Sequence, residues 1–132
     1  MRRRGLLGLS AATLMALTGS AFAADDNAAQ GKAAFAKCAI CHQVGPDAKT
    51  LVGPELNGIV GRKAASVTDY NYSPGMKELG EKGFVWTEEN LDKWITDPKA
   101  LLPNSPMSLT FQGIRDADER ASIVGYLKTF PE

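Results

Sequence analysis

Three segments of the chain carry apolar residues at the spacing of a helix. A fourth helix is predicted from the residues at its start. Leu91, Trp94 and Ile95 share one helical face, and Ile123 and Leu127 stand one turn apart. No segment shows the alternation that is typical of a strand, so we predict an all-α domain. The predicted helices cover residues 28–37, 74 to about 79, 88 to the proline at 98, and a last segment that begins near 116.

The residues at the helix starts support this division. Ser73 is a suitable N-cap before Pro74, which fits the first position of a helix. Thr87 is a suitable N-cap for the next helix, and two glutamates follow it in the first turn. Gly31 costs the first helix about 1 kcal/mol relative to alanine, which indicates close packing at that position.

Residues 43–72 carry turn and loop signals instead of a helical period. They include Gly45-Pro46, Gly53-Pro54 and Asn57-Gly58. An irregular stretch of this length is unusual in a compact domain unless something organises it, and a bound cofactor would do so.

The two cysteines and the only histidine of the chain lie within five consecutive residues. They form the run Cys38-Ala39-Ile40-Cys41-His42, the Cys-x-x-Cys-His pattern that attaches a c-type haem. In this pattern two thiols add to the vinyl groups of the porphyrin, and the adjacent imidazole can reach the iron. The sequence therefore predicts one haem c, covalently held by Cys38 and Cys41, with His42 as a ligand of the iron.

A zinc site and a thiol–disulfide redox site are the alternatives for a Cys-x-x-Cys pair. Zinc needs about four protein ligands, and the chain has no second pair of cysteines or histidines. A dithiol oxidoreductase places the pair at the start of a helix after a strand, and no strand pattern precedes this pair. Both alternatives fit the sequence less well than haem attachment.

The first 23 residues have the composition of a secretory signal. Three arginines at positions 2–4 precede an apolar stretch from Gly5 to Gly19, and Ala21-Phe22-Ala23 is a small-x-small cleavage site. An uncleaved anchor is the alternative, although the stretch is short for a membrane span of about 20 residues. We predict cleavage near Ala23, a domain of residues 24–132 and a periplasmic location.

The charge balance of the predicted mature domain is acidic. The whole chain has 15 basic and 15 acidic residues, and removal of the signal leaves 12 basic residues, a net charge of −3. Nucleic-acid-binding proteins present a basic face, so no nucleic-acid partner is expected. A single domain of this size has a small core, to which a buried haem would add apolar contact. We expect a monomer.

Taken together, these motifs resemble the class I cytochromes c, small electron carriers in which three main helices, short helices and loops wrap around one covalently bound haem. The resemblance covers nearly all of residues 28–130 and implies that Gly31 lets Tyr126 of the last helix come close. It rests on the spacing Gly31-x-x-x-Phe35-x-x-Cys38, on Gly53-Pro54, Gly61-Arg62 and Trp86, on the loop Pro103-Asn104-Ser105-Pro106-Met107, and on Ile123, Tyr126 and Leu127.

The second iron ligand is a methionine in this family. Met1 and Met15 belong to the predicted signal, which leaves Met76 and Met107. Met76 falls in a predicted short helix, whereas Met107 lies in a proline-bracketed loop that matches the loop of the family's distal ligand. The resemblance therefore implies that the iron of the haem is bound by His42 and Met107.

Other residues around the haem are also implied by the resemblance. The second ring nitrogen of His42 would donate to the carbonyl of Pro54. Three side chains that would bind a haem propionate are Arg62, Tyr72 and Trp86. Trp94 stands where the family commonly has a tyrosine near the methionine sulfur, and an indole cannot accept a hydrogen bond. Phe111 would cover the haem edge.

The resemblance implies one-electron transfer without an enzymatic reaction. The implied donors are a quinol-oxidising cytochrome complex or a dehydrogenase, and the implied acceptors are a terminal oxidase, a reductase, a peroxidase or a photosynthetic reaction centre. Lys37, Lys63 and Lys99 would form a basic patch that steers docking. The rival function is that of a haem peroxidase or gas-binding haem protein with an open distal site.

Overall fold

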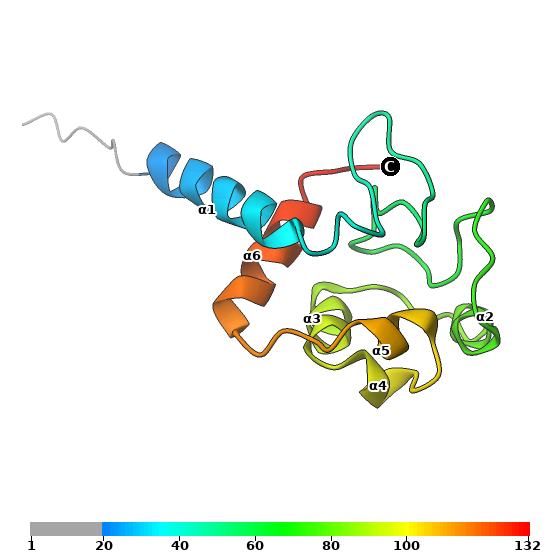
Figure 1. The fold of residues 1–132 in the computed structure, drawn as a ribbon. Coiled ribbons are helices and arrows are strands. Elements are labelled where there is room, and N and C mark those ends of the chain that lie inside the picture. The colour runs from blue at the N-terminus through cyan, green and yellow to red at the C-terminus, as the bar shows by residue number, and fades with distance from the viewer. Residues whose placement is uncertain (1–19) are drawn as a thin grey trace, which may run out of the picture.

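The computed structural model describes residues 20–132 of the chain, which form helices joined by loops (Figure 1). The helices of this part are α1 (Ser20–Phe35), α2 (Pro74–Glu81), α3 (Glu88–Thr96), α4 (Pro98–Leu101), α5 (Pro106–Thr110) and α6 (Ala117–Leu127). Within residues 20–132 the only β-pairing is an isolated bridge between Lys63 and Val85. The prediction of an all-α fold is confirmed.

Polar N-caps fix the starts of three predicted helices. Ser73, Thr87 and Asp116 precede α2, α3 and α6, and each side-chain oxygen accepts a backbone N–H two or three residues further on, at 3.4, 3.1 and 2.9 Å. The starts predicted for these helices are therefore confirmed. Helix α1 begins at Ser20, earlier than the predicted residue 28.

Helices α4 and α5 were not predicted. Each begins with a small polar residue before a proline, as α2 does: the side chain of Asp97 accepts the N–H of Lys99 at 3.0 Å, and that of Ser105 accepts the N–H of Ser108 at 3.2 Å. The expectation that residues 103–107 form only a loop is wrong, because Met107 lies in the first turn of α5.

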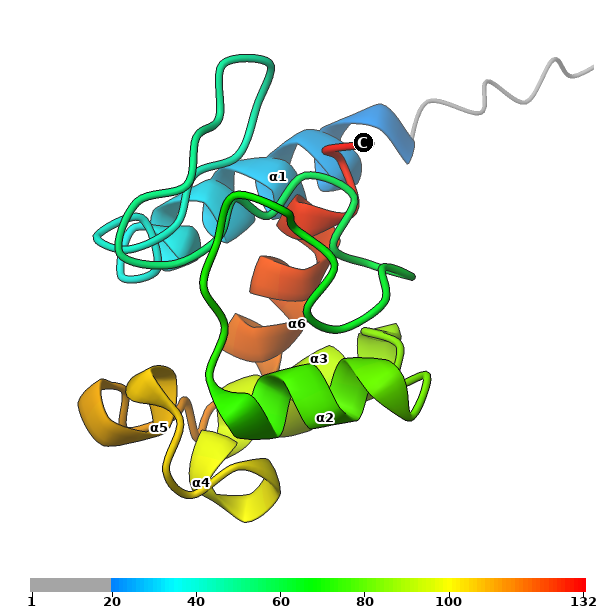
Figure 2. The same ribbon diagram turned by 90° about the vertical axis from the view of Figure 1, so that its right-hand side faces the viewer.

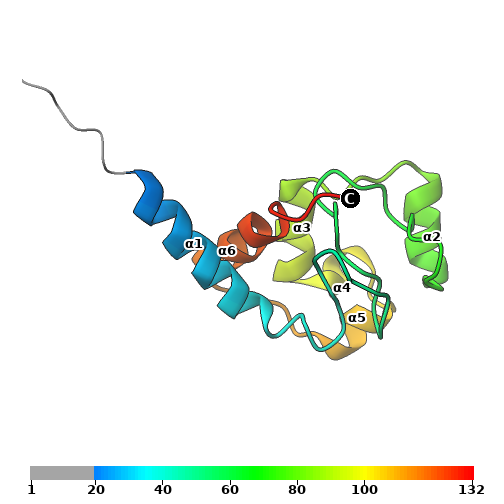
Figure 3. The same cartoon turned by 90° about the horizontal axis from the view of Figure 1, so that it is seen from above.

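Helices α1 and α6 cross, as seen in Figures 1 and 3. Gly31 is buried at the crossing, where an added Cβ would lie 2.5 Å from the carbonyl oxygen of Ser122 and 2.6 Å from Cβ of Tyr126. The close approach predicted for Gly31 and Tyr126 is confirmed. Since Cys38 follows α1 by three residues, this crossing also fixes where the Cys-x-x-Cys-His run begins.

The core lies where α1, α3 and α6 meet the loops. Arg120 ties α6 to α3, because its Nε donates to Asp92 Oδ1 at 2.7 Å and its Nη1 donates to the carbonyl oxygen of Ile114 at 3.0 Å. The buried apolar side chains are those of Phe35, Ile59, Ala64, Trp86, Leu91, Trp94, Ile95, Ile114, Ile123, Val124 and Leu127.

Residues 43–72 contain no helix, as predicted, and they form the long loops that rise above α2 in Figure 2. The loops are held by their own hydrogen bonds. The side chain of Asn57 bonds the N–H and the carbonyl oxygen of Gly45 at 2.8 and 2.7 Å, and the N–H of Gly58 donates to the carbonyl oxygen of Phe130 at 2.8 Å. The last residues of the chain thereby hold this loop in place.

Most of the predicted secretory signal, residues 1–19, lies outside the described residues. Residues 20–23, the end of that signal, belong to the first turn of α1. In the described part of the chain, no helix has both the length and the apolar character needed to cross a membrane.

Candidate functional site

One cavity brings together every residue that the sequence analysis proposed for the site. Its walls come from the Cys-x-x-Cys-His run, the loop after it and parts of α2, α3, α5 and α6. The proposed residues that line it are Cys38, Cys41, His42, Pro54, Arg62, Tyr72, Trp86 and Met107.

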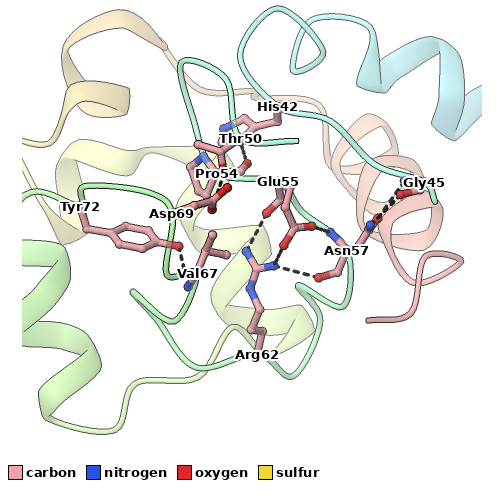
Figure 4. Close-up of polar contacts among 10 residues, drawn as sticks. All are labelled: His42, Gly45, Thr50, Pro54, Glu55, Asn57, Arg62, Val67, Asp69 and Tyr72. Carbon is pink, nitrogen blue, oxygen red and sulfur yellow. Dashed lines mark hydrogen bonds and ion pairs between the residues drawn. The ribbon is translucent and has the colours of Figure 1, made fainter. Parts of the chain in front are cut away.

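The imidazole of His42 is held in one orientation. Its Nδ1 donates to the carbonyl oxygen of Pro54 at 2.7 Å (Figure 4). With the proton assigned to Nδ1 by this hydrogen bond, Nε2 keeps a free lone pair. Burial lowers the pKa of His42, and the positive charge of Arg62 lowers it further, against the opposing effect of the Pro54 hydrogen bond. A neutral imidazole with one free nitrogen is the form that binds a metal ion.

Gly53 makes room for this ring. A Cβ at position 53 would lie 2.4 Å from Cε1 and 2.8 Å from Nδ1 of His42. No side chain fits there unless the imidazole or the loop moves. The glycine of the Gly53-Pro54 pair is therefore required by its contact with the ring of His42.

The thiols of Cys38 and Cys41 are both free and both partly buried. Burial raises the pKa of Cys38 to about 11. Thiol–disulfide oxidoreductases need the opposite, because their attacking cysteine has a lowered pKa. This environment argues against the dithiol alternative.

On another wall of the cavity, Trp94 contacts Met107. The indole Nε1 donates to Met107 Sδ at 3.0 Å. The sequence indicates only that an indole cannot accept a hydrogen bond, and the structure shows that this one donates. A thioether sulfur has two lone pairs, so one remains for a metal ion.

Two buried serines, whose role was not predicted from the sequence, hold the turn of Met107. The hydroxyls of Ser105 and Ser108 lie 2.7 Å apart, and Ser108 Oγ also donates to the carbonyl oxygen of Leu102. The two side chains are 4% and 0% exposed. Ser105-Pro106 repeats the Ser73-Pro74 start of α2, and this signal was available in the sequence.

The guanidinium of Arg62 is buried and makes three hydrogen bonds within the protein, which leave two of its N–H bonds unused (Figure 4). Nη1 donates to Glu55 Oε1 at 3.1 Å and to the carbonyl oxygen of Asn57 at 2.8 Å, and Nη2 donates to the carbonyl oxygen of Glu55 at 2.9 Å. Glu55 is one of 15 acidic residues and follows no recognisable motif, so the sequence alone does not single it out.

Tyr72 and Trp86 keep donors available in the cavity. The hydroxyl oxygen of Tyr72 accepts the N–H of Val67 at 3.3 Å, and burial raises the pKa of the phenol, so its hydrogen stays on the oxygen and can be donated. The buried indole of Trp86 lines the cavity as well, and its nitrogen carries one N–H donor. Both side chains suit an anionic group of a ligand.

The three lysines predicted to form a patch are not gathered at the cavity. Lys37 and Lys63 line it, whereas Lys99 lies in α4 and does not. Lys37 also forms an ion pair with Glu119. Phe111, which follows α5, lines the cavity as well.

The donors in this cavity fit a covalently attached haem, since they comprise two free thiols, a neutral imidazole and a thioether within mainly apolar walls. No family model matches the chain. The chain is 42% identical to cytochrome c2 of Afifella marina over 105 residues, which cover 80% of this chain and 83% of that protein. It is 44% identical to cytochrome c-554 of Methylosinus trichosporium over 131 residues, which cover 98% and 95%. The chain belongs to the class I cytochromes c.

Solved structures of relatives agree with this membership. Cytochrome c2 from Rhodospirillum centenum has a TM-score of 0.70 and 38% identity, and the match covers 80% of this chain and 98% of that one. Cytochrome cH from Methylobacterium extorquens has a TM-score of 0.67 and 39% identity, over 77% and 97%. The predicted fold and family are confirmed. The cytochrome is a haem electron carrier with one haem c, covalently bound through Cys38 and Cys41.

Proposed function

We propose that the cytochrome is a periplasmic one-electron carrier whose haem iron would be bound by His42 and Met107. One observation carries the proposal: the free nitrogen of His42 and the sulfur of Met107 line the same cavity as the two cysteines. The bound haem supplies an iron that takes up and releases one electron. With two protein ligands the iron has no open position for a substrate.

The residues around the haem would shift its reduction potential in opposite directions. The thioether of Met107 is a soft neutral ligand and raises the reduction potential. The Trp94 N–H draws electron density from that sulfur and acts in the same direction. The Pro54 carbonyl makes the imidazole of His42 a stronger donor, which opposes this effect. Tyr72 and Trp86 would orient the haem by donating to a propionate.

We also propose that the cytochrome is exported and that it docks onto redox partners. A signal over residues 1–23 would be cleaved near Ala23, and the domain of residues 24–132 would work as a monomer. Its membrane partners would be a quinol-oxidising cytochrome complex and a terminal oxidase or reaction centre; soluble dehydrogenases or reductases would also fit. The exposed side chains of Ile40 and Val52, beside the cysteines, support brief docking through a small apolar surface.

Spectra of the protein purified from the periplasm test the proposal. We expect haem staining on a denaturing gel, the ferric charge-transfer band of methionine-bound iron, and no uptake of cyanide or carbon monoxide. Staining without that band, together with ready uptake of either ligand, would favour the peroxidase or gas-binding alternative. A colourless product would favour a dithiol protein.

The hydrogen bond between Trp94 and Met107 leads to a prediction. Trp94→Phe removes the donor, so the sulfur becomes more electron-rich and stabilises oxidised iron. One hydrogen bond contributes about 1 kcal/mol, so we expect the reduction equilibrium constant to fall about fivefold. A redox titration measures the change, and chemical unfolding of the same variant separates it from the packing loss. An unchanged constant in a destabilised variant would show that the indole acts only in packing.

A further inference from the structure

Arg62 and Glu55 form an ion pair beside the cavity (Figure 4). One carboxylate oxygen of Glu55 accepts from Arg62 Nη1 at 3.1 Å, and the other accepts the backbone N–H of Asn57 at 2.7 Å. Two further hydrogen bonds run from Arg62 to the carbonyl oxygens of Asn57 and Glu55. A guanidinium has five N–H bonds. Three of them are used inside the loop, and two remain.

The two charged side chains differ in burial. Arg62 lines the cavity, and its side chain is 8% exposed. Glu55 does not line the cavity, and its side chain is 23% exposed. Arg62 therefore borders the cavity, and the carboxylate of Glu55 lies outside the cavity wall. Tyr72 and Trp86, the other donors proposed for this part of the cavity, carry no charge.

A cation beside the haem favours the reduced state, because oxidised iron carries one more positive charge. This stabilisation of the reduced state by a cation is strong where water is excluded. A carboxylate bound to the same cation opposes it, because the field of an ion pair falls off faster with distance than that of one charge. The two remaining N–H bonds of Arg62 stay available as hydrogen-bond donors in either case.

We propose that Glu55 is a positioning residue that lowers the reduction potential, by neutralising Arg62 and holding its side chain in place. This inference rests on the proposed one-electron function. It assigns a role to a carboxylate that contacts neither the cysteines nor the two proposed iron ligands.

The direct test compares Glu55→Gln with Glu55→Asp in the haem-loaded protein. Glu55→Gln removes the charge, so we expect the reduction equilibrium constant against a mediator to rise about fivefold, which is about 40 mV for one electron. Glu55→Asp keeps the charge and should stay within about twofold of wild type. Equal shifts in the two variants, or a Glu55→Gln constant at or below the wild-type value, would overturn the proposal.

Glu89→Gln is the matched control. Glu89 pairs with Lys93 at 2.6 Å on α3, but its side chain is 75% exposed. Solvent screens such a pair, so the constant should stay within about twofold of wild type. A shift as large as that of Glu55→Gln would contradict a specific role for Glu55.

A double-mutant cycle tests whether Glu55 acts through Arg62. Arg62→Gln should lower the reduction constant, and adding Glu55→Gln to it should have little further effect, since the carboxylate acts through Arg62. If Glu55→Gln shifts the constant equally with and without Arg62, the proposal is wrong. Failure of the proposed function is a separate result, seen as a missing charge-transfer band in the wild-type protein.

Discussion

Gly53→Ala is expected to remove most of the His42-bound haem from the exported protein. The added Cβ would stand 2.4 Å from Cε1 of the imidazole and 3.0 Å from Nε2, the nitrogen proposed to bind the iron. The ring must then turn or the loop must shift, and either change disturbs the 2.7 Å hydrogen bond to Pro54. We expect at least about a tenfold loss of six-coordinate haem and a free energy of unfolding lower by about 3 kcal/mol.

Absorption spectra at equal protein concentration and chemical unfolding measure these effects. Gly125→Ala is the matched control, because an added Cβ there meets nothing within 4 Å and the residue lies inside α6. A helical glycine replaced by alanine should leave the haem intact and stabilise the protein by up to about 1 kcal/mol. If Gly53→Ala binds haem as Gly125→Ala does, the ring is not held by this contact.

Local signals account for what the sequence predicted. The helix starts at Ser73, Thr87 and Asp116 depend on residues two or three positions apart, and the Cys-x-x-Cys-His run depends on five. N-caps and motifs of this length can be recognised in the sequence without knowledge of the fold. The start of α5 at Ser105-Pro106 belongs to the same class, and it was missed because the prolines were interpreted as loop signals.

Contacts between distant parts of the chain account for what the sequence did not predict. Trp94 and Met107 are 13 positions apart, and only the fold of the chain, in which α4 contacts both α3 and α5, brings the indole nitrogen to the sulfur. Glu55 reaches Arg62 through the fold of an irregular loop, for which no periodicity exists. The family resemblance identified Arg62 but not the carboxylate that pairs with it. Side chains that adjust the cofactor are therefore the least predictable part of this site.

Met107→Leu is expected to change both the ligand binding and the reduction potential of the iron. Leucine keeps the apolar volume in α5 but has no lone pair, so the distal position of the iron would open. The ferric charge-transfer band should disappear, and cyanide and carbon monoxide should bind. Loss of the thioether also removes a ligand that favours reduced iron. We expect the reduction equilibrium constant to fall at least about 100-fold, which is about 120 mV for one electron.

Met76→Leu is the matched control for that prediction, because Met76 also lines the cavity, from α2. Its sulfur accepts no hydrogen bond among the described residues, whereas Met107 Sδ accepts one from Trp94. If Met107 is the ligand, Met76→Leu keeps the band, resists cyanide and shifts the reduction constant by less than about threefold. The opposite pattern would make Met76 the ligand. In that case the turn built by Ser105 and Ser108 would serve packing only, and the hydrogen bond from Trp94 would have no effect on the iron.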